Sequence, residues 1–383
     1  MVVKWARVLV VAAAFLISAP AARAGGLYGG NTDAPAFASS RHSVWSGGRL
    51  QEVGSEAQPR VELDFPLQCQ FGTECRTLFH VDLSGGALKP VDYMGKALTY
   101  EGHTGTDFWI PSWARYERGV DVLAAANGVV AGIVDTESDR TTPQLFQSGR
   151  DSKFSIAEKS NALVIDHGNG WRSLYAHLKK GSMLVKNGQR VRRGQKIARV
   201  GMSGSPLQHL HFEVQSLGAP ICPFSGTATS VAPGDTSRSL WSKKALAALK
   251  YEPIEVVAPT FAENVGKFTD QILSDAIQEK LPTPKENSQS FNFIAIIYGT
   301  QKGDYAKIEI YPDEKKDRAA GYGYCGTRGM GICMLRAEKF LTRWPIDKKI
   351  VAGEEVVGRI TLFHDDDTKF FEVEKRIKIG SAS

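Results

Sequence analysis

The sequence has only one long hydrophobic run, and it lies at the N-terminus. The first 24 residues, MVVKWARVLVVAAAFLISAPAARA, start with Lys4 and Arg7, are apolar from Val8 to about Ala22, and end in a small residue, Ala24. This order is typical of a secretory signal peptide that is cleaved after Ala24. The run is shorter than the about 20 residues that cross a bilayer. No later segment is apolar enough to span a membrane. We therefore expect an exported protein of the periplasm or cell envelope, without stable membrane insertion after cleavage.

Cysteine is scarce, with five residues in 383. Cys69 with Cys75 and Cys325 with Cys333 are close in sequence, and such pairs tend to be oxidised outside the cytoplasm. Neither pair has a second cysteine pair or histidines at zinc-finger spacing, so a cysteine-rich structural zinc site is not expected. Cys222 is left over and is expected to be a small buried residue, although other pairings that involve it remain open.

A large excess of charge is also missing. The formal net charge is +6, and it falls to +3 after signal cleavage because the leader carries three basic residues and no acidic ones. An excess this small does not imply nucleic acid as a partner. The chain also lacks internal repetition at a period of 20 to 50 residues, which excludes a repeat array.

Short apolar runs broken by glycine predict a mainly β protein. Runs such as GVVAGIV and NALVIDHGNGWRSLYAHL favour an antiparallel sheet, barrel-like or sandwich, with HGNG as a hairpin turn. We expect a signal peptide (1–24), a flexible lead-in (25–60), a first β domain (61–225), a linker (226–260) with the helix-like SRSLWSKKALAALKY, and a smaller, sandwich-like C-terminal β domain (261–383). A polar insertion at residues 136–160 interrupts the first sheet. It is long enough to be a lid or rim, and we expect it to border a substrate groove.

The segment QHLHFEV holds two histidines, His209 and His211, in a strand-like alternation of polar and apolar residues. In a strand the side chains at i and i+2 project from one face, so the two imidazoles would lie side by side. Leu210 and Phe212 would face the opposite layer.

Upstream, GHTGTDF places His103 and Asp107 four residues apart, and Gly105 between them favours a looped or extended backbone over a helix. Two imidazole nitrogens and one carboxylate oxygen suit zinc, and three protein ligands leave a fourth position for water. If His209 and His211 both bound the metal, the set would be closed. One of them is therefore expected to act as a base or transition-state donor beside the ion.

The motifs GHTGTDF, SLYAHL and HLHFEV, in this order and with VRRGQKIARVGMSG between the last two, resemble the lysostaphin-type (LytM) zinc endopeptidases. The resemblance covers residues 88–224, and it implies that His103, Asp107 and His211 bind one Zn²⁺ per chain. His177 and His209 become the pair that activates water and stabilises the transition state, with His209 taken as the base. The segment GQRVRRGQKIARVG also resembles the hairpin that forms one half of a lipoyl-like sheet, which this family shares.

The chain departs from the family in the insertion after Asp135 and in ICPF, where members often have an aspartate before the proline. Neither departure touches the five site residues. The resemblance implies a zinc-dependent metalloendopeptidase that hydrolyses peptide cross-links of peptidoglycan. The alternatives are a non-catalytic murein-binding module or amidase activator, and an adaptor whose C-terminal β domain is the functional part. The bond that would be cleaved stays open.

Overall fold

The computed structural model describes residues 45–46, 49–50, 60–85, 89–139, 160–205, 207–263, 265, 270–286, 288, 290–301, 303–312, 321–326, 329–338 and 351–381. The signal peptide and residues 140–159 of the polar insertion lie outside these ranges. Residues Val61–Ser383 fall in one compact unit, and Phe15–Arg60 form another. In the latter, β1 (Trp45–Ser46) pairs with β2 (Arg49–Leu50). Within the described residues, no helix has the length and apolar character needed to cross a membrane.

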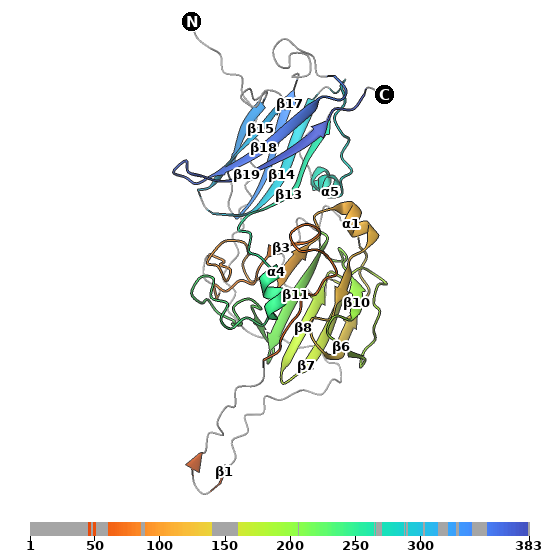
Figure 1. The fold of residues 1–383 in the computed structure, drawn as a ribbon, viewed down its shortest axis with the longest axis vertical. Helices are drawn as coiled ribbons and strands as arrows, with labels where there is room; N and C mark the ends of the chain where they lie inside the picture. Colours follow the sequence, from red (N-terminus) through yellow and green to blue (C-terminus); the bar gives the residue numbers. More distant parts are fainter. Residues whose placement is uncertain are drawn as a thin grey trace. The chain divides into compact units, whose positions relative to one another are not determined.

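The central element of the larger unit is an antiparallel sheet in which β11 pairs with β4, β8 and β12 (Figure 1). The strands, in spatial order, are β3 (Arg76–Phe79), β4 (Thr106–Trp109), β11 (His209–Ser216), β8 (Trp171–Ala176), β7 (Ala162–Gly168), β6 (Gly128–Val134) and β9 (Arg190–Val191), with β12 (Ala219–Ile221) beside β11. A separate two-stranded sheet pairs β5 (Asp121–Leu123) with β10 (Lys196–Arg199). β11 lies inside the sheet, so both of its edges carry neighbours.

One face of this sheet forms the hydrophobic core. Leu210 and Phe212 of β11 are fully buried, as the alternation predicted. The Phe212 ring packs against Tyr175 at 5.3 Å and Trp241 at 5.6 Å between ring centroids. Burying one such side chain stabilises the fold by about 1.5–3 kcal/mol. The core therefore holds β11 in one register, and its odd-numbered side chains point to the other face.

The predicted hairpin at HGNG is confirmed: β7 and β8 are antiparallel, with Gly168 opposite Trp171. Asn169 and Gly170 have φ values of 51° and 77°, the left-handed region that glycine and asparagine tolerate best. This turn matters because β8 ends at Ala176, directly before His177.

The short helices lie outside the sheet. α1 (Trp113–Arg118) begins after Ser112, whose Oγ accepts from the Arg115 amide, and α4 (Lys243–Ala248) begins in the same way after Ser242. α4 lies within the predicted helical run SRSLWSKKALAALKY. A further helix, α5, comprises Asp270–Ile277.

The C-terminal strands form two antiparallel sheets (Figure 1). One contains β13 (Glu255–Glu263), β14 (Ser290–Thr300) and β17 (Gly329–Glu338), and the other contains β16 (Gly321–Gly326), β15 (Tyr305–Pro312), β18 (Glu355–Phe363) and β19 (Lys369–Lys378). Phe293 and Ile297 of β14 share a buried cluster with Ile308 of β15 and Ile360 of β18. The two sheets therefore enclose a common core, and the prediction of a mainly β protein with a sandwich-like C-terminal part is confirmed.

The predicted disulfide between Cys69 and Cys75 is present. Cys222 is a free, buried thiol, as expected. For Cys325 and Cys333 the structure describes the backbone but not the side chains, so the second disulfide stays a prediction.

Candidate metal centre

Strand pairing brings the site together from distant parts of the chain. Asp107 of β4 lies directly opposite His211 of β11, and His211 on its other side lies opposite Ala176 of β8. Directly opposed side chains in an antiparallel pair share one face at about 4.5–5.5 Å between Cβ atoms. Because the apolar side chains of β11 fill the core, the polar ones meet Asp107 on the opposite face.

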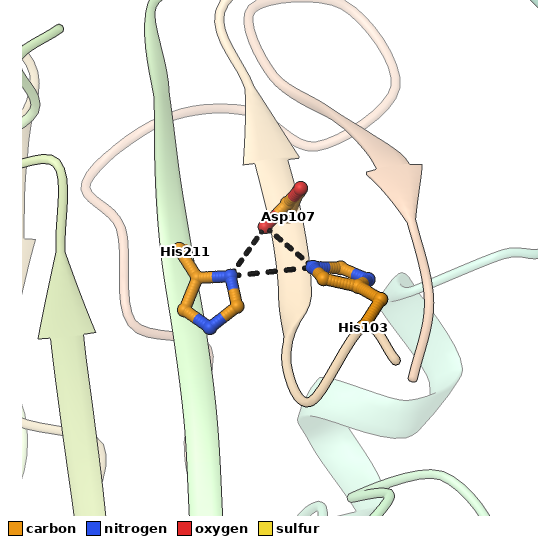
Figure 2. A group of neighbouring side chains, drawn as sticks. All are labelled: His103, Asp107 and His211. Carbon is orange, nitrogen blue, oxygen red and sulfur yellow. Dashed lines mark hydrogen bonds and ion pairs between the residues drawn. The ribbon is translucent and has the colours of Figure 1, made fainter. Parts of the chain in front are cut away.

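Three side chains converge on one point, as Figure 2 shows. His211 Nδ1 lies 2.8 Å from Asp107 Oδ1. His103 Nε2 lies 3.2 Å from the same oxygen and 3.2 Å from His211 Nδ1. All three residues are at most 3% exposed. Two nitrogens and one oxygen packed this closely form a ligand set suited to a divalent cation, with a further coordination position left for water.

The remaining nitrogen of His103 fixes which atom faces the cluster. His103 Nδ1 donates to the backbone carbonyl of His80 at 2.7 Å. The proton therefore resides on Nδ1, and Nε2 presents its lone pair toward Asp107 and His211. A buried donor held by a carbonyl is the usual way in which proteins orient a metal-binding imidazole.

Gly105 makes room for the His211 ring. A Cβ atom at this position would lie 2.6 Å from His211 Cε1 and Nε2 and 2.9 Å from the Phe212 carbonyl oxygen. Any other residue would push the imidazole away from Asp107. The glycine of GHTGTDF thus serves close packing at the site, in addition to the looped backbone that the sequence predicted.

The other two histidines predicted for the site lie beside this group. The rings of His177 and His209 are 4.6 Å apart, and the His209 Nε2 atom lies 3.7 Å from Asp107 Oδ1. His177 Nδ1 donates to the Ser203 carbonyl at 2.7 Å, and His209 Nδ1 donates to the Leu207 carbonyl at 3.0 Å. Both imidazoles therefore keep the Nε2 lone pair free on the side of the cluster.

Burial and neighbouring charge separate the histidines by pKa. Burial lowers the pKa of His177 to about 3, and the adjacent His209 and His211 lower it as well. Burial also lowers the pKa of His209, although Asp107 opposes the shift. Both side chains are neutral at pH 7 and can accept a proton.

The Asp107 and His211 pair behaves in the opposite way. Burial raises the pKa of Asp107, but His103 and His209 outweigh it and hold the carboxyl pKa well below its ordinary value. Burial lowers the pKa of His211, but the hydrogen bond to Asp107 and the nearby negative charge of Glu213 raise it to about 9. Asp107 is therefore a carboxylate, and binding of a cation at His211 Nδ1 would displace a proton.

The structure thus brings together all five residues predicted for the site. Sequence reasoning missed the backbone carbonyls of His80, Ser203 and Leu207, because every residue has a carbonyl and the residue type does not show which ones bind a histidine. It also missed Tyr100, whose ring stacks on His103 at 4.5 Å, and Glu213. The alternation in QHLHFEV could have identified Glu213, because this residue lies on the same face of the strand as His209 and His211.

Residues 101–223 match the family described as Peptidase family M23. A 92-residue segment, 22% of the chain, is 43% identical to the peptidoglycan DD-endopeptidase ShyB of Vibrio cholerae. A 63-residue segment, 16% of the chain, is 40% identical to the murein hydrolase activator NlpD of Salmonella typhimurium. The matched parts span 21% of ShyB and 16% of NlpD, far less than the whole of either relative. A solved structure of a zinc-containing peptidase from Vibrio cholerae is 24% identical, with a TM-score of 0.28, over 45% of this chain and 41% of that one.

Proposed function

We propose, from the premise that residues 101–223 form a LytM-type domain of peptidase family M23, that this protein is a zinc-dependent endopeptidase that hydrolyses peptide cross-links of peptidoglycan. The observation that carries the proposal is the convergence of His103, Asp107 and His211 within 3.2 Å, with two neutral imidazoles beside them. A cluster that served the fold alone would need neither the free lone pairs nor the glycine that makes room for His211.

In this proposal His103 Nε2, Asp107 Oδ1 and His211 Nδ1 hold one Zn²⁺ per chain. When bound, the ion would lower the pKa of a water molecule and polarise the scissile carbonyl. Asp107 contributes the negative charge that offsets part of the ion's charge in a buried site. The carbonyl of His80 keeps His103 in the tautomer that can bind.

His209 and His177 would move protons and stabilise charge. We take His209 as the base, because its Nε2 atom lies 3.7 Å from Asp107 Oδ1, one of the atoms that would hold the ion. A neutral imidazole can take a proton from the water and pass it to the leaving amine. His177, held by Ser203 and packed against His209, also presents an Nε2 lone pair, so it would have to take up a second proton before it could donate a hydrogen bond to the developing oxyanion.

A second candidate function is a murein hydrolase activator, which the similarity to NlpD favours. An activator needs the binding surface of the domain but not its ligand set. The intact group of five site residues in this chain favours catalysis over that alternative.

The proposed location is the periplasm or cell envelope. It is supported by the N-terminal sequence and by the Cys69–Cys75 disulfide, which is typical of proteins outside the reducing cytoplasm. The proposed partner is therefore the peptide portion of the cell wall.

Two measurements on the purified mature chain test the proposal: zinc per chain by elemental analysis, and release of soluble fragments from purified peptidoglycan. One zinc per chain with fragment release that a chelator abolishes is the expected result. Full zinc occupancy without any fragment release would favour the activator, and the His211→Ala variant serves as the inactive control.

A further inference from the structure

Glu213 is a buried carboxylate beside the candidate metal centre. It lies on β11, two residues beyond His211, and is 6% exposed. Glu213 Oε2 lies 3.7 Å from His211 Nε2, and the two side chains form an ion pair when His211 is protonated. A buried carboxylate costs several kcal/mol unless it is hydrogen-bonded or paired with positive charge, so the partners of this one bear on its role.

Both oxygens of Glu213 are held in place by hydrogen bonds. Thr104 Oγ1 donates to Oε2 at 2.5 Å, and Gln215 Nε2 donates to Oε1 at 2.5 Å. Thr104 belongs to the segment that carries His103 and Asp107. The carboxylate therefore connects that segment to β11, which carries the third residue of the group.

His211 presents different nitrogens to the two carboxylates. Its Nδ1 atom lies in the cluster with Asp107 and His103. Its Nε2 atom is buried and has no hydrogen-bond partner among the described residues. Glu213 Oε2 is the carboxylate oxygen that lies near this Nε2 atom, at 3.7 Å. When Nδ1 binds a cation, the proton of the neutral imidazole must reside on Nε2, where it faces Glu213.

We propose that Glu213 is a positioning residue for the metal: it accepts the Nε2 proton of His211, fixes the tautomer that binds through Nδ1, and increases the affinity of the site for zinc. This inference rests on the zinc-dependent function proposed above. The charges agree with it, because one divalent ion is balanced by two buried carboxylates, Asp107 and Glu213. Outer carboxylates of this kind typically raise metal affinity by about 10 to 100-fold.

The test is the zinc dissociation constant of the full mature chain, measured by competition with a chromophoric zinc chelator. Glu213→Gln keeps the size of the side chain and one acceptor oxygen, but it removes the charge and replaces the other oxygen by an NH2 donor. Its zinc dissociation constant should rise by about 10 to 100-fold. Glu213→Asp keeps the charge and should restore part of the affinity. The matched control is Asp166→Asn on β7, whose carboxylate pairs with Arg172 and should leave the constant unchanged.

Circular dichroism of the metal-free variants shows whether they are folded. If Glu213→Gln does not fold, Thr104→Val tests the same contact, because it frees Oε2 without removing the charge and should weaken zinc binding by a smaller factor. A folded Glu213→Gln chain with the zinc affinity of the wild type would overturn the inference alone. A wild-type chain that binds no zinc would overturn the proposed function, so the two failures are distinguishable.

Discussion

His103, Asp107 and His211 are each prepared for a cation by a different neighbour. The carbonyl of His80 fixes the proton on the far side of His103, and nearby imidazoles keep Asp107 ionised. Gly105 leaves space for the ring of His211. At the scale of single residues, the five site side chains therefore separate into three that share one point and two that lie beside it.

Replacing the histidines one at a time should separate these roles. His211→Ala removes one of three ligands, so both zinc and hydrolysis should be lost. His209→Ala and His177→Ala leave the three converging atoms in place and should keep about one zinc per chain, with cleavage reduced by about 100 to 10,000-fold. Elemental analysis and peptidoglycan cleavage on the same samples measure both effects. If His209→Ala loses zinc as completely as His211→Ala, the division into ligands and base is wrong.

His80 gives a separate prediction on pH. Its ring is 1% exposed, packs among Tyr93, Phe224 and Tyr251, and has no hydrogen-bond partner for either nitrogen in the described residues. Burial lowers its pKa from 6.5 to about 3. Below pH 6.5 the unfolded chain binds a proton that the folded chain excludes. The contribution to stability is therefore complete above pH 6.5 and is lost as the pH falls toward 3, by up to about 1.4 kcal/mol per pH unit.

His80→Phe should remove this acid sensitivity while keeping an aromatic ring in the same space. The free energy of unfolding, from urea titrations at about pH 7.5 and about pH 5, should fall less in the variant than in the wild type. The backbone carbonyl that holds His103 is unaffected by the substitution. Equal losses in both proteins would show that His80 is already protonated in the folded state.

At the scale of elements, the described start of the polar insertion is tied to the loops around His177. Asp139 accepts hydrogen bonds from the Lys180 amide at 2.7 Å and from the Met202 amide at 3.0 Å. The next carbonyl after Met202, that of Ser203, receives the His177 Nδ1 proton. One carboxylate therefore bridges the loop that follows His177 and the loop that holds its ring.

Asp139→Ala should loosen this bridge. Losing two hydrogen bonds to a carboxylate is expected to lower the free energy of unfolding by about 1–3 kcal/mol and to reduce cleavage, while zinc content is unchanged. Asp135→Ala is the matched control, because Asp135 accepts from Gly181 in the same loop without reaching Met202. Urea unfolding, zinc analysis and cleavage assays provide the readouts. Equal loss of cleavage in the two variants would contradict the bridging role.

At the scale of the whole molecule, the proposed metal centre should couple zinc binding to folding. Asp107 and His211 are separated by 104 residues and meet only when β4 pairs with β11. The unfolded chain therefore has no preformed site, and zinc should bind the folded state alone.

Thermal unfolding should accordingly depend on zinc concentration. Zinc at a hundredfold excess over its dissociation constant should stabilise the wild type by about 2.7 kcal/mol, and the melting temperature should continue to rise with further zinc. His211→Ala lacks one of the three proposed ligands and should melt at the same temperature with and without zinc. A shift of equal size in that variant would place the stabilising metal elsewhere on the molecule.

Local pattern was sufficient for much of the structure. Alternation in QHLHFEV placed the two imidazoles on one face of a strand, HGNG predicted a hairpin, and six-residue spacing predicted the Cys69–Cys75 disulfide. The ordered motifs also predicted the family and the five residues of the site. The strand, the hairpin and the disulfide depend on residues within a few positions of one another, so the amino-acid sequence by itself determined them. The family and the candidate site residues were predicted from motifs that are far apart in the sequence.

Tertiary structure alone decided how the side chains are held. Two backbone carbonyls orient imidazoles: that of His80 holds His103, 23 residues away, and that of Ser203 holds His177, 26 residues away. Every residue has a carbonyl, so the sequence cannot show which ones have this role. The contact between Thr104 and Glu213 spans 109 residues. Such pairings are set by the order and register of β4, β11 and β8, which the burial of the opposite face enforces across the whole sheet. For that physical reason, which nitrogen faces the metal could be determined only in the folded protein.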